Sequence, residues 1–370
     1  MLRVAEGREH ARSASAMRWT RLDSLIFCML VASACESQSS RHNAAPAIAH
    51  RAVQDSSYID SLHVEIVPLE RVIPHEYIDP VRVVDLVKFT EENEVVANPI
   101  IVVKSGENYV VMDGATRTAA LKSIHASNAI VQVVSESTGF SLGTWYHAIP
   151  VFAEDRLVRL LDSLPLLRLE ELPAMPPREK QFVSTDIAYV QMRNGRVLVV
   201  HPRPGVETLD AMNQFTASYT DAVGEGGHHK VQRTRAETLQ EVQKNFGEIP
   251  ATALVTYPAL RQDDITAVVD AGAFVPAGIT RSIVNGRLLN LSVPLQWLMD
   301  PNTAASNQLL QELIAQKKAA GEFDELEAGY TVCEENGPRP YAEALVVLKP
   351  FDYRYFLTGS GDCQPDGIND

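Results

Sequence analysis

Cysteine is scarce in this sequence, and its distribution excludes several kinds of chemistry. The 370 residues contain four cysteines: Cys28, Cys35, Cys333 and Cys363. No CxxC pair and no histidine at metal-ligand spacing accompanies them, so the pattern does not predict a structural zinc site. Because none lies between Asp55 and Asp300, the central part of the chain lacks a thiol that could act as a nucleophile or in a redox reaction.

Positive charge is also limited. The chain has 33 lysines and arginines against 47 aspartates and glutamates, which gives a formal net charge of -14. Affinity for the phosphate backbone of DNA or RNA requires clustered cations, so we expect no strong nucleic-acid binding. A small anionic ligand is compatible with this charge, because it needs only one local pocket.

An apolar stretch near the N-terminus, Leu25 to Ala34, is too short to span a bilayer as a helix, and we expect no transmembrane span. It follows the charged run 18–21 and precedes Cys35, which is the order of a signal sequence. Three interpretations stay open: a secretory or lipoprotein-type signal, an organelle presequence, or translated sequence upstream of the true start codon. We expect a cytoplasmic protein, while the signal-like segment from Leu25 to Cys35 leaves export or organelle targeting open.

Length and proline positions predict how the chain is organised. With 45% hydrophobic and 22% charged residues the composition is that of a globular protein, and 370 residues exceed one average domain. Pro173, Pro176 and Pro177 mark a break after the first folded section. We predict four parts: a signal-like or disordered extension (1–54), a first mixed α/β section (55–172), a second one (173–300) and a C-terminal extension of unassigned role (301–370).

Hydrophobic periodicity predicts the elements of these parts and an α/β fold class with a mixed sheet. In the first section we predict strands at 63–69, 99–103, 109–112 and 131–134, and helices at 79–94, 116–124 and 157–164. In the second we predict strands at 187–190, 197–200 and 252–257, and helices at 207–217, 234–246 and 262–271. The C-terminal part has a predicted helix at 303–318 and a predicted strand at 342–348.

The turn Asp113-Gly114 joins a predicted strand directly to a predicted helix. Backbone N–H groups at the start of such a helix point into solvent and, with the helix dipole, form an anion site. Arg117 adds charge and can hold a phosphate with two parallel hydrogen bonds, while Gly114 allows close approach. Asp113 would be free to orient a metal ion or the attacking group. From these residues alone, a simple surface turn explains the sequence equally well.

Three ordered blocks resemble the ParB/sulfiredoxin nucleotide-binding domain: residues 69–76, 98–102 and 109–121. Within that superfamily, three shorter blocks are similar to the free L-serine kinase family (SerK/SbnI-like): Pro-His-Glu at 74–76, Thr-Trp-Tyr-His at 144–147 and Pro-Ala-Gly-Ile-Thr-Arg at 276–281. The resemblance covers roughly residues 63–298. It implies a ParB/sulfiredoxin-like nucleotide-binding domain at 55–172 and a second mixed α/β domain at 173–300 that contributes to the amino-acid site.

The resemblance also implies an enzyme. Its activity would be the transfer of a phosphoryl group from ATP or ADP to the hydroxyl of free L-serine, or a related hydroxy amino acid, to give O-phospho-L-serine. Glu76 is implied as the base on the substrate hydroxyl and Asp113 as a second catalytic carboxylate. The implied nucleotide and phosphate ligands are Asn98, Gly114, Ala115, Thr116 and Arg117. The implied residues of the amino-acid site are Trp145, His147, Thr280, Arg281 and Ser282.

These residue types suit the chemistry. Phosphoryl transfer passes through a loose transition state, so its rate depends mainly on alignment and charge stabilisation. The planar fork of Arg281 matches the two oxygens of an α-carboxylate. Glu76 and Asp113, if they lie close together, would form a platform for Mg²⁺, which we predict as a cofactor beside ATP or ADP.

Two departures from the family pattern concern imidazole groups. The family often has a histidine after Asp-Gly, where this chain has Ala115-Thr116, and another after Thr-Arg, where it has Ser282. These departures leave the acceptor open between serine, homoserine and threonine. The sequence does not choose between ATP and ADP, and it predicts no oligomeric state.

Two other functions occur on this fold. A ParB-like nucleotide-switched DNA-binding or regulatory protein without kinase activity is the alternative; the acidic charge and the lack of a recognisable helix-turn-helix argue against it. Sulfiredoxin-type repair of oxidised cysteine requires a cysteine in the phosphate loop. This chain has Ala115-Thr116 there, so that activity is excluded.

Overall fold

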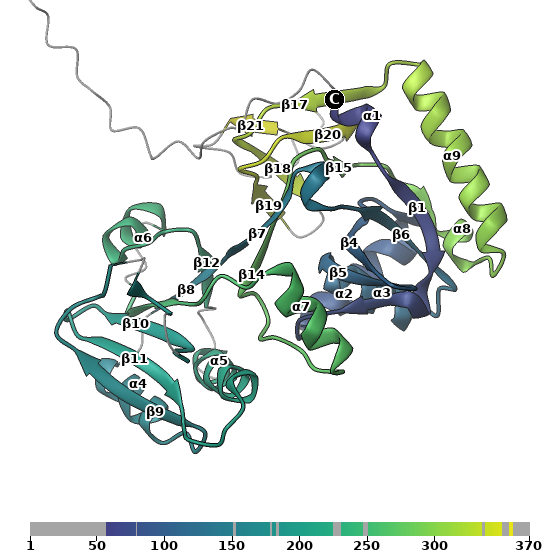
Figure 1. Ribbon diagram of the computed structural model, residues 1–370. Coiled ribbons are helices and arrows are strands. Elements are labelled where there is room, and N and C mark those ends of the chain that lie inside the picture. Colours follow the sequence, from purple (N-terminus) through teal and green to yellow (C-terminus); the bar gives the residue numbers. More distant parts are fainter. Residues whose placement is uncertain are drawn as a thin grey trace, which may run out of the picture. The chain divides into compact units, whose positions relative to one another are not determined.

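The fold is described from a computed structural model (Figure 1). The described residues are 57–78, 80–150, 153–177, 180–182, 185–224, 231–246, 251–334, 337–349 and 355–357. By its internal contacts the chain divides into Met1–Val53 and Gln54–Asp370, and every described element belongs to the second unit. The signal-like segment from Leu25 to Cys35 lies outside the described residues. Within the described ranges, no helix is long and apolar enough to cross a membrane.

The first sheet is mixed and has five strands in the order β1-β6-β4-β5-β2. Its strands are β1 (Val64–Pro68), β2 (Val72–Pro74), β4 (Ile100–Ser105), β5 (Asn108–Asp113) and β6 (Asn128–Val133). The pairs β1–β6 and β4–β5 are antiparallel, whereas β4–β6 and β2–β5 are parallel. The predicted strands of the first section, including the β4–β5 hairpin, are therefore confirmed.

Helices on this sheet come from both ends of the described chain. They are α2 (Pro80–Asn93), α3 (Ala115–Ser123), α8 (Leu295–Met299) and α9 (Thr303–Ala319). Helices α2 and α3 pack together, and α9 lies along β1, where Ile66 N–H donates to Asn307 Oδ1 at 3.1 Å (Figure 1). The buried core of this sheet includes Ile100, Ile130, Leu298, Leu310 and Val346. Residues beyond 300 thus complete the core of the first sheet.

The second sheet has six strands in the order β12-β8-β13-β10-β11-β9, and every neighbouring pair is antiparallel. Its strands are β8 (Tyr146–Ile149), β9 (Leu167–Leu172), β10 (Ala188–Met192), β11 (Val197–Pro202), β12 (Gln232–Thr234) and β13 (Ala253–Thr256). The accompanying helices are α4 (Glu154–Asp162), α5 (Thr208–Gly224), α6 (Leu239–Phe246) and α7 (Gln262–Asp270). Phe215 and Tyr219 of α5 are fully buried in the core of this sheet.

A two-stranded ladder joins residues of the two sheets. It consists of β7 (Phe140–Thr144) and β14 (Thr280–Val284), which pair antiparallel. Strand β7 leads through Trp145 into β8 of the second sheet, and β14 contacts β5 of the first. Side chains from both sheets therefore meet along β14, which is where the candidate site lies.

Further strands follow β14. Strands β15 (Arg287–Leu289), β20 (Leu345–Leu348) and β17 (Phe323–Leu326) form one sheet, and β19 (Gly337–Pro340), β18 (Tyr330–Glu334) and β21 (Tyr355–Leu357) form another. Strand β15 is parallel to β20, and β17 is antiparallel to it. Short elements complete the order: α1 (Tyr58–Ser61), the 3₁₀ helices Leu69–Arg71 and Glu136–Thr138, β3 (Val95–Val96) and β16 (Val293–Pro294).

One predicted helix begins later than the periodicity indicated. The prediction of a helix from residue 234 is wrong, because Thr234 is the last residue of β12 and α6 begins at Leu239. The Thr234 hydroxyl accepts a hydrogen bond from Ala236 N–H, and the Thr238 hydroxyl accepts one from Glu241 N–H. Threonine side chains thus hold the chain in a turn and cap the helix, in competition with a helical backbone.

Candidate functional site

The corner between β5 and α3 has the predicted strand-glycine-helix geometry. Gly114 is the N-cap of α3 and has φ 103°, a left-handed conformation that favours glycine. A Cβ at this position would lie 3.0 Å from Nη1 of Arg117 and 3.4 Å from Cα of Ile100. The Thr118 N–H donates to Gly114 O at 2.9 Å and starts the helix. Both conformation and space therefore require glycine here, and Ala115, Thr116 and Arg117 form the first turn.

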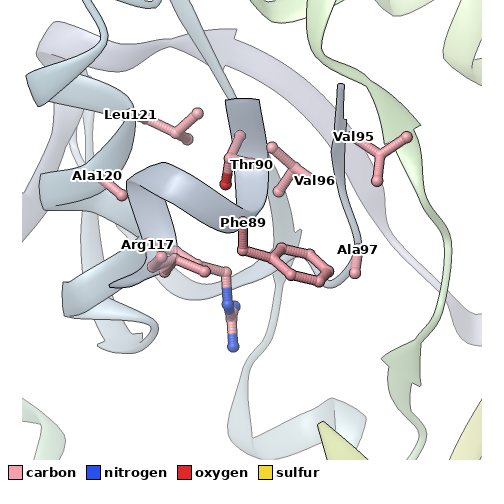
Figure 2. A pocket seen from close by; sticks show the side chains of 9 residues that line it. Phe89, Thr90, Val95, Val96, Ala97, Arg117, Ala120 and Leu121 are labelled. Carbon is pink, nitrogen blue, oxygen red and sulfur yellow. The ribbon is translucent and has the colours of Figure 1, made fainter. Parts of the chain in front are cut away.

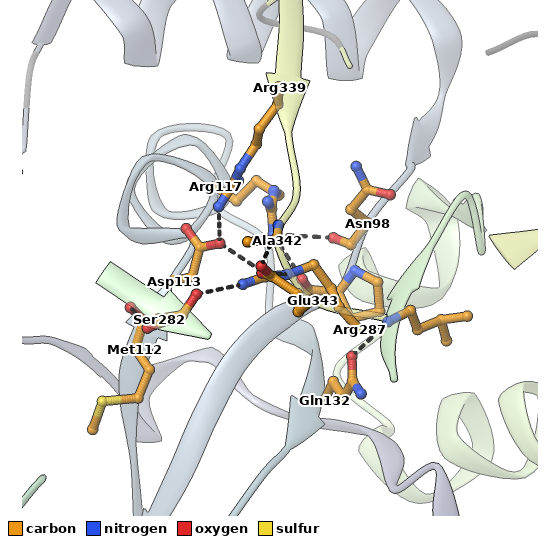
Figure 3. A network of polar contacts seen from close by, with 12 residues as sticks. Asn98, Met112, Asp113, Arg117, Gln132, Ser282, Arg287, Arg339, Ala342 and Glu343 are labelled. Carbon is orange, nitrogen blue, oxygen red and sulfur yellow. Dashed lines mark hydrogen bonds and ion pairs between the residues drawn. The ribbon is translucent and has the colours of Figure 1, made fainter. Parts of the chain in front are cut away.

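Two arginines bind the Asp113 carboxylate at this corner (Figure 3). Arg287 Nη1 donates to Asp113 Oδ2 at 2.6 Å, and Arg339 Nη2 donates to the same oxygen at 2.7 Å. Burial alone would raise the pKa of Asp113, but Arg339, Arg287 and Arg117 together lower it far below its usual range. Asp113 is therefore ionised at any pH near neutral.

The arginines are held in turn by residues from the C-terminal part. The Arg287 side chain is only 3% exposed, and its Nε lies 3.6 Å from Oε1 of the buried Glu343. The guanidinium groups of Arg287 and Arg339 lie 5.4 and 5.0 Å from the ring centroid of Tyr341. None of these four residues was predicted from the sequence to belong to the site, although an arginine directly before the apolar pair Leu288-Leu289 is an unusual residue for a buried strand.

Asn98 and Arg117 also meet at this corner. Arg117 Nη1 donates to the carbonyl oxygens of Pro99 at 2.7 Å and Asn98 at 3.4 Å. The Asn98 side chain is buried, and its Oδ1 accepts from Asn290 N–H at 2.8 Å. Asn98 thus fixes the backbone at Asn290, and its nucleotide-binding role stays a prediction.

A small cavity lies beside Arg117 between α2 and α3 (Figure 2). It is lined by apolar residues together with two polar ones: Leu86, Phe89, Thr90, Val95, Val96, Ala97, Arg117, Ala120 and Leu121. Figure 2 shows the Arg117 guanidinium directed away from the apolar side chains. With a volume of about 10 Å³ the cavity has room for about one water molecule and is too small for a nucleobase.

The Glu76 carboxylate lies at the other end of the candidate site. Its Oε2 accepts hydrogen bonds from Gly278 N–H at 3.0 Å and from the Thr280 hydroxyl at 3.3 Å. The backbone is fixed nearby, because Tyr77 N–H donates to Val275 O at 3.1 Å. The structure therefore brings together Glu76 and Thr280, which the sequence analysis placed in one site.

Strand β14 connects this carboxylate to the Asp113 corner. Thr280 and Ser282 are two residues apart and face the same side, so their Cα atoms lie about 7 Å apart. The Ser282 hydroxyl donates to Met112 O at 2.7 Å, and Arg287 Nη2 donates to Ser282 O at 3.1 Å. Glu76 at one end and Asp113 at the other are thus attached to the same strand.

The predicted amino-acid residues Arg281 and Trp145 are in contact. The guanidinium carbons of Arg281 and Arg235 lie 5.4 and 5.5 Å from the Trp145 ring centroid. Burial and, to a smaller extent, the nearby Arg235 lower the pKa of Arg281 to about 10, while Glu343 opposes the change. Both cations are therefore charged at neutral pH in a partly desolvated region, which favours an anionic ligand.

His147 is buried below the loop that holds Glu76. Its Nε2–H donates to Gly278 O at 3.0 Å, and its Nδ1 accepts from the Tyr219 hydroxyl. Burial lowers the pKa of His147 to about 4; the bond to Gly278 opposes this change, and Arg233 adds to it. Both ring nitrogens are occupied inside the protein, so the predicted contact of His147 with substrate stays a prediction.

The donor set does not fit an Mg²⁺ ion held by the protein. Within the described residues, no group of three or more His, Cys, Asp or Glu side chains is placed to bind a metal. The Asp113 carboxylate is already neutralised by two guanidinium groups, and Glu76 accepts from a backbone N–H. A divalent cation at Asp113 would be repelled by the same arginines.

The Glu76 carboxylate and the Asp113 corner with its arginines are thus connected through one strand of a mixed α/β fold. Comparison with known proteins agrees. The ATP-dependent L-serine kinase SbnI of Staphylococcus aureus (strain NCTC 8325 / PS 47) is 25% identical to this chain over 264 residues, which cover 70% of this chain and 92% of that protein. No family model matches the chain.

Solved structures show the same fold. SbnI with a C-terminal truncation, from Staphylococcus aureus, has a TM-score of 0.53 and 24% identity, over 69% of this chain and 97% of that one. A free serine kinase in complex with AMP has a TM-score of 0.55 and 17% identity, over 64% of this chain and 93% of that one. The predicted α/β fold and the predicted resemblance to the free L-serine kinase family are therefore confirmed, and the DNA-binding alternative is not favoured.

Proposed function

We propose that this protein is a kinase that transfers a phosphoryl group from ATP or ADP to the hydroxyl of free L-serine. One observation carries the proposal: β14 holds a carboxylate, Glu76, at one end and the Asp113 corner with its arginines at the other. A base and an anion site at such a spacing suit a hydroxyl acceptor and a phosphate donor. The similarity to an ATP-dependent L-serine kinase supports the same reaction.

The nucleotide phosphates are assigned to the corner at Gly114. Backbone N–H groups of Ala115 and Thr116 and the side chain of Arg117 provide donors at the start of α3. Three arginines, Arg117, Arg287 and Arg339, exceed the two carboxylates Asp113 and Glu343 by one charge at this corner. Charge that develops on the transferred group is therefore stabilised by groups that are already fixed in place. Asp113 acts here by orienting the arginines.

The amino acid is assigned to the space between Trp145 and Glu76. Arg281 pairs with the α-carboxylate through its planar fork, and Trp145 forms a wall of the pocket. Glu76 accepts the proton of the substrate hydroxyl as the phosphoryl group transfers. His147 positions Gly278, whose N–H holds Glu76.

The predicted Mg²⁺ is assigned to the nucleotide substrate. Magnesium prefers phosphate oxygens and water as ligands, and it arrives in solution already bound to ATP or ADP. We propose the cytoplasm as the compartment, because the reaction needs these nucleotides. The domain limits at residues 54, 172 and 300 stay predictions.

Mass spectrometry of a reaction with serine and either nucleotide tests the proposal. We expect O-phospho-L-serine from the full-length protein, and a fall in kcat of at least about 100-fold in Glu76→Gln. The matched control is Glu171→Gln, an exposed carboxylate paired with Arg196 at 2.8 Å. Absence of product with serine, homoserine and threonine would refute the kinase assignment, and an unchanged kcat in Glu76→Gln would refute the base.

A further inference from the structure

Arg235 lies beside the proposed amino-acid site, yet the reaction described above gives it no role. It directly follows β12, whose antiparallel ladder with β8 ends on the pair Thr234 and Tyr146. Continued by one residue, this register brings Arg235 opposite Trp145. The side chains agree with this placement, because the guanidinium carbon of Arg235 lies 5.5 Å from the Trp145 ring centroid.

Trp145 and β12 are both fixed against the loop that holds the proposed base. Trp145 N–H donates to Ile279 O at 2.9 Å. The Arg233 guanidinium occupies the space where a Cβ on Gly278 would lie, and Gly278 has φ 75°, a left-handed conformation that favours glycine. Because position 278 has no side chain, β12 can approach this loop closely, and Arg235 extends over the ring from a fixed strand end.

Two guanidinium groups are therefore held near one ring. The guanidinium carbon of Arg281 lies 5.4 Å from the Trp145 centroid, and all three residues are half-buried. Burial lowers the pKa of both arginines, the charge of Arg235 adds to the change in Arg281, and Glu343 opposes it in both. Glu343 is shared, since its Oε1 lies 3.6 Å from Arg287 Nε. A further carboxylate bound by both guanidinium groups would reduce their mutual repulsion.

We propose that Arg235 is a specificity-determining residue of the amino-acid site: together with Arg281 it binds the α-carboxylate of the acceptor. This inference rests on the proposed function. An ionised carboxylate has two oxygens with about four lone-pair sites, enough for donors from two planar guanidinium groups. The site thereby selects a free amino acid over a serine side chain within a peptide, whose carboxyl group is part of an amide bond.

Steady-state kinetics of Arg235→Gln test this assignment. The carboxylate contact is made equally before and during phosphoryl transfer, so its loss raises KM and leaves kcat in place. We expect KM for L-serine to rise about 10- to 100-fold, which is the range for a hydrogen bond to a charged group, while KM for the nucleotide stays the same. A merely structural disturbance would also lower kcat. Arg235→Lys keeps the charge without the planar fork and should give an intermediate KM.

L-Serinamide separates carboxylate recognition from other effects, because it has the hydroxyl and amino groups of serine but no carboxylate. Arg235→Gln should lower kcat/KM for L-serine and leave kcat/KM for L-serinamide unchanged. The matched control is Arg168→Gln, which removes an exposed arginine from β9, the opposite edge strand of the same sheet, and should change neither value. Equal losses for the two acceptors in Arg235→Gln, or an unchanged KM for L-serine, would overturn the proposal.

Binding without turnover separates this inference from the kinase assignment. Calorimetric titration of the full-length protein with L-serine and with L-serinamide, in the presence of AMP, measures the two affinities alone. We expect L-serine to bind at least about 10-fold more tightly than L-serinamide, and Arg235→Gln to weaken only the binding of L-serine. An L-serine affinity that stays the same in Arg235→Gln refutes the inference even if phosphoserine is formed. Absence of phosphoserine from a protein with the expected affinities refutes only the proposed function.

Discussion

At the scale of single residues, buried ionisable groups connect the site to stability. His147 titrates near 6.5 in an unfolded chain, whereas burial lowers its pKa to about 4 in the fold. Between these values the unfolded chain binds a proton that the folded chain does not, so the free energy of unfolding falls as the pH is lowered from 6.5 to 4. The loss reaches about 3 kcal/mol, and urea unfolding at a series of pH values measures it.

In His147→Gln this part of the pH dependence should disappear. The variant can still donate to Gly278 O, so a folded protein is expected. Equal slopes of unfolding free energy against pH in the two proteins, between pH 6.5 and 4, would show that His147 does not carry the effect. His63→Asn serves as the comparison, because its side chain is 61% exposed.

Asp113 gives a second residue-scale prediction. Its carboxylate compensates Arg287, whose side chain is 3% exposed. Asp113→Asn should lower the free energy of unfolding by about 3 kcal/mol or more, because a buried cation loses a partner. The effect should be complete above the ordinary carboxyl pKa and vanish in strong acid, since the lowered pKa of Asp113 stabilises the ionised form. Denaturant unfolding at pH 7 measures the change.

The control for Asp113 is an exposed ion pair. Glu171→Gln breaks the contact with Arg196, whose partner Glu171 is 53% exposed, and should change stability by less than about 1 kcal/mol. An equally small change in the free energy of unfolding for Asp113→Asn would show that other groups compensate the charges of Arg287 and Arg339.

Residue identities predicted only part of this site. Asp113-Gly114, Glu76 and Thr280 lie in short blocks that resemble a family, so the sequence revealed them. Arg287 and Arg339 bind Asp113 across 174 and 226 residues of sequence, and such separations leave no periodicity. The contacts of the buried His75 with Val111 O and Thr280 Oγ1 were not predictable for the same reason, because Thr280 is 205 residues away in the sequence.

At the scale of elements, the start of α3 is a constrained turn. Gly114→Ala would combine a φ of 103° with a Cβ that is 3.0 Å from Arg117 Nη1. We expect a loss of about 1 to 3 kcal/mol in stability and weaker ATP binding, measured by thermal unfolding and calorimetry. Gly195→Ala is the matched control: its φ is 91°, but no atom lies within 4 Å of the added Cβ. Equal losses of stability in the two variants would show that backbone strain, and not the contact with Arg117, explains the loss. Equal ATP binding by the two variants would show that the contact at Gly114 does not affect the nucleotide.

Local sequence patterns predicted most helices and strands. They failed where side-chain hydrogen bonds or the pairing of distant strands determines the secondary structure. Helix α2 and the β4–β5 hairpin follow from periodicity and turn residues. The start of α6 was wrong because threonine hydroxyls compete with the helical backbone. Strands β7 and β14 were not predicted, since a two-stranded ladder between the distant segments 140–144 and 280–284 has no local sequence signal.

At the scale of the whole molecule, the part beyond residue 300 is structural. Leu310, Val346 and Leu348 are buried in the core of the first sheet, and Arg339 reaches Asp113. We expect a chain that ends at Asp300 to lack a cooperative thermal transition, because its first core is left open to water. Circular dichroism of the shortened and full chains compares them. A sharp transition near that of the full chain would mean that residues 301–370 are not needed for the stability of the first core.

The pairing of Asp113 with Arg339 has a consequence for synthesis. Asp113 leaves the ribosome 226 residues before Arg339, a delay of about 10 to 45 s at common translation rates of about 5 to 20 residues per second. Over the first 174 residues of this interval the acid lacks both of its counter-ions, and after that it lacks Arg339. The nascent chain therefore completes the Asp113 corner only after Arg339 has been made, and a polypeptide that stops before Arg339 lacks part of the candidate site.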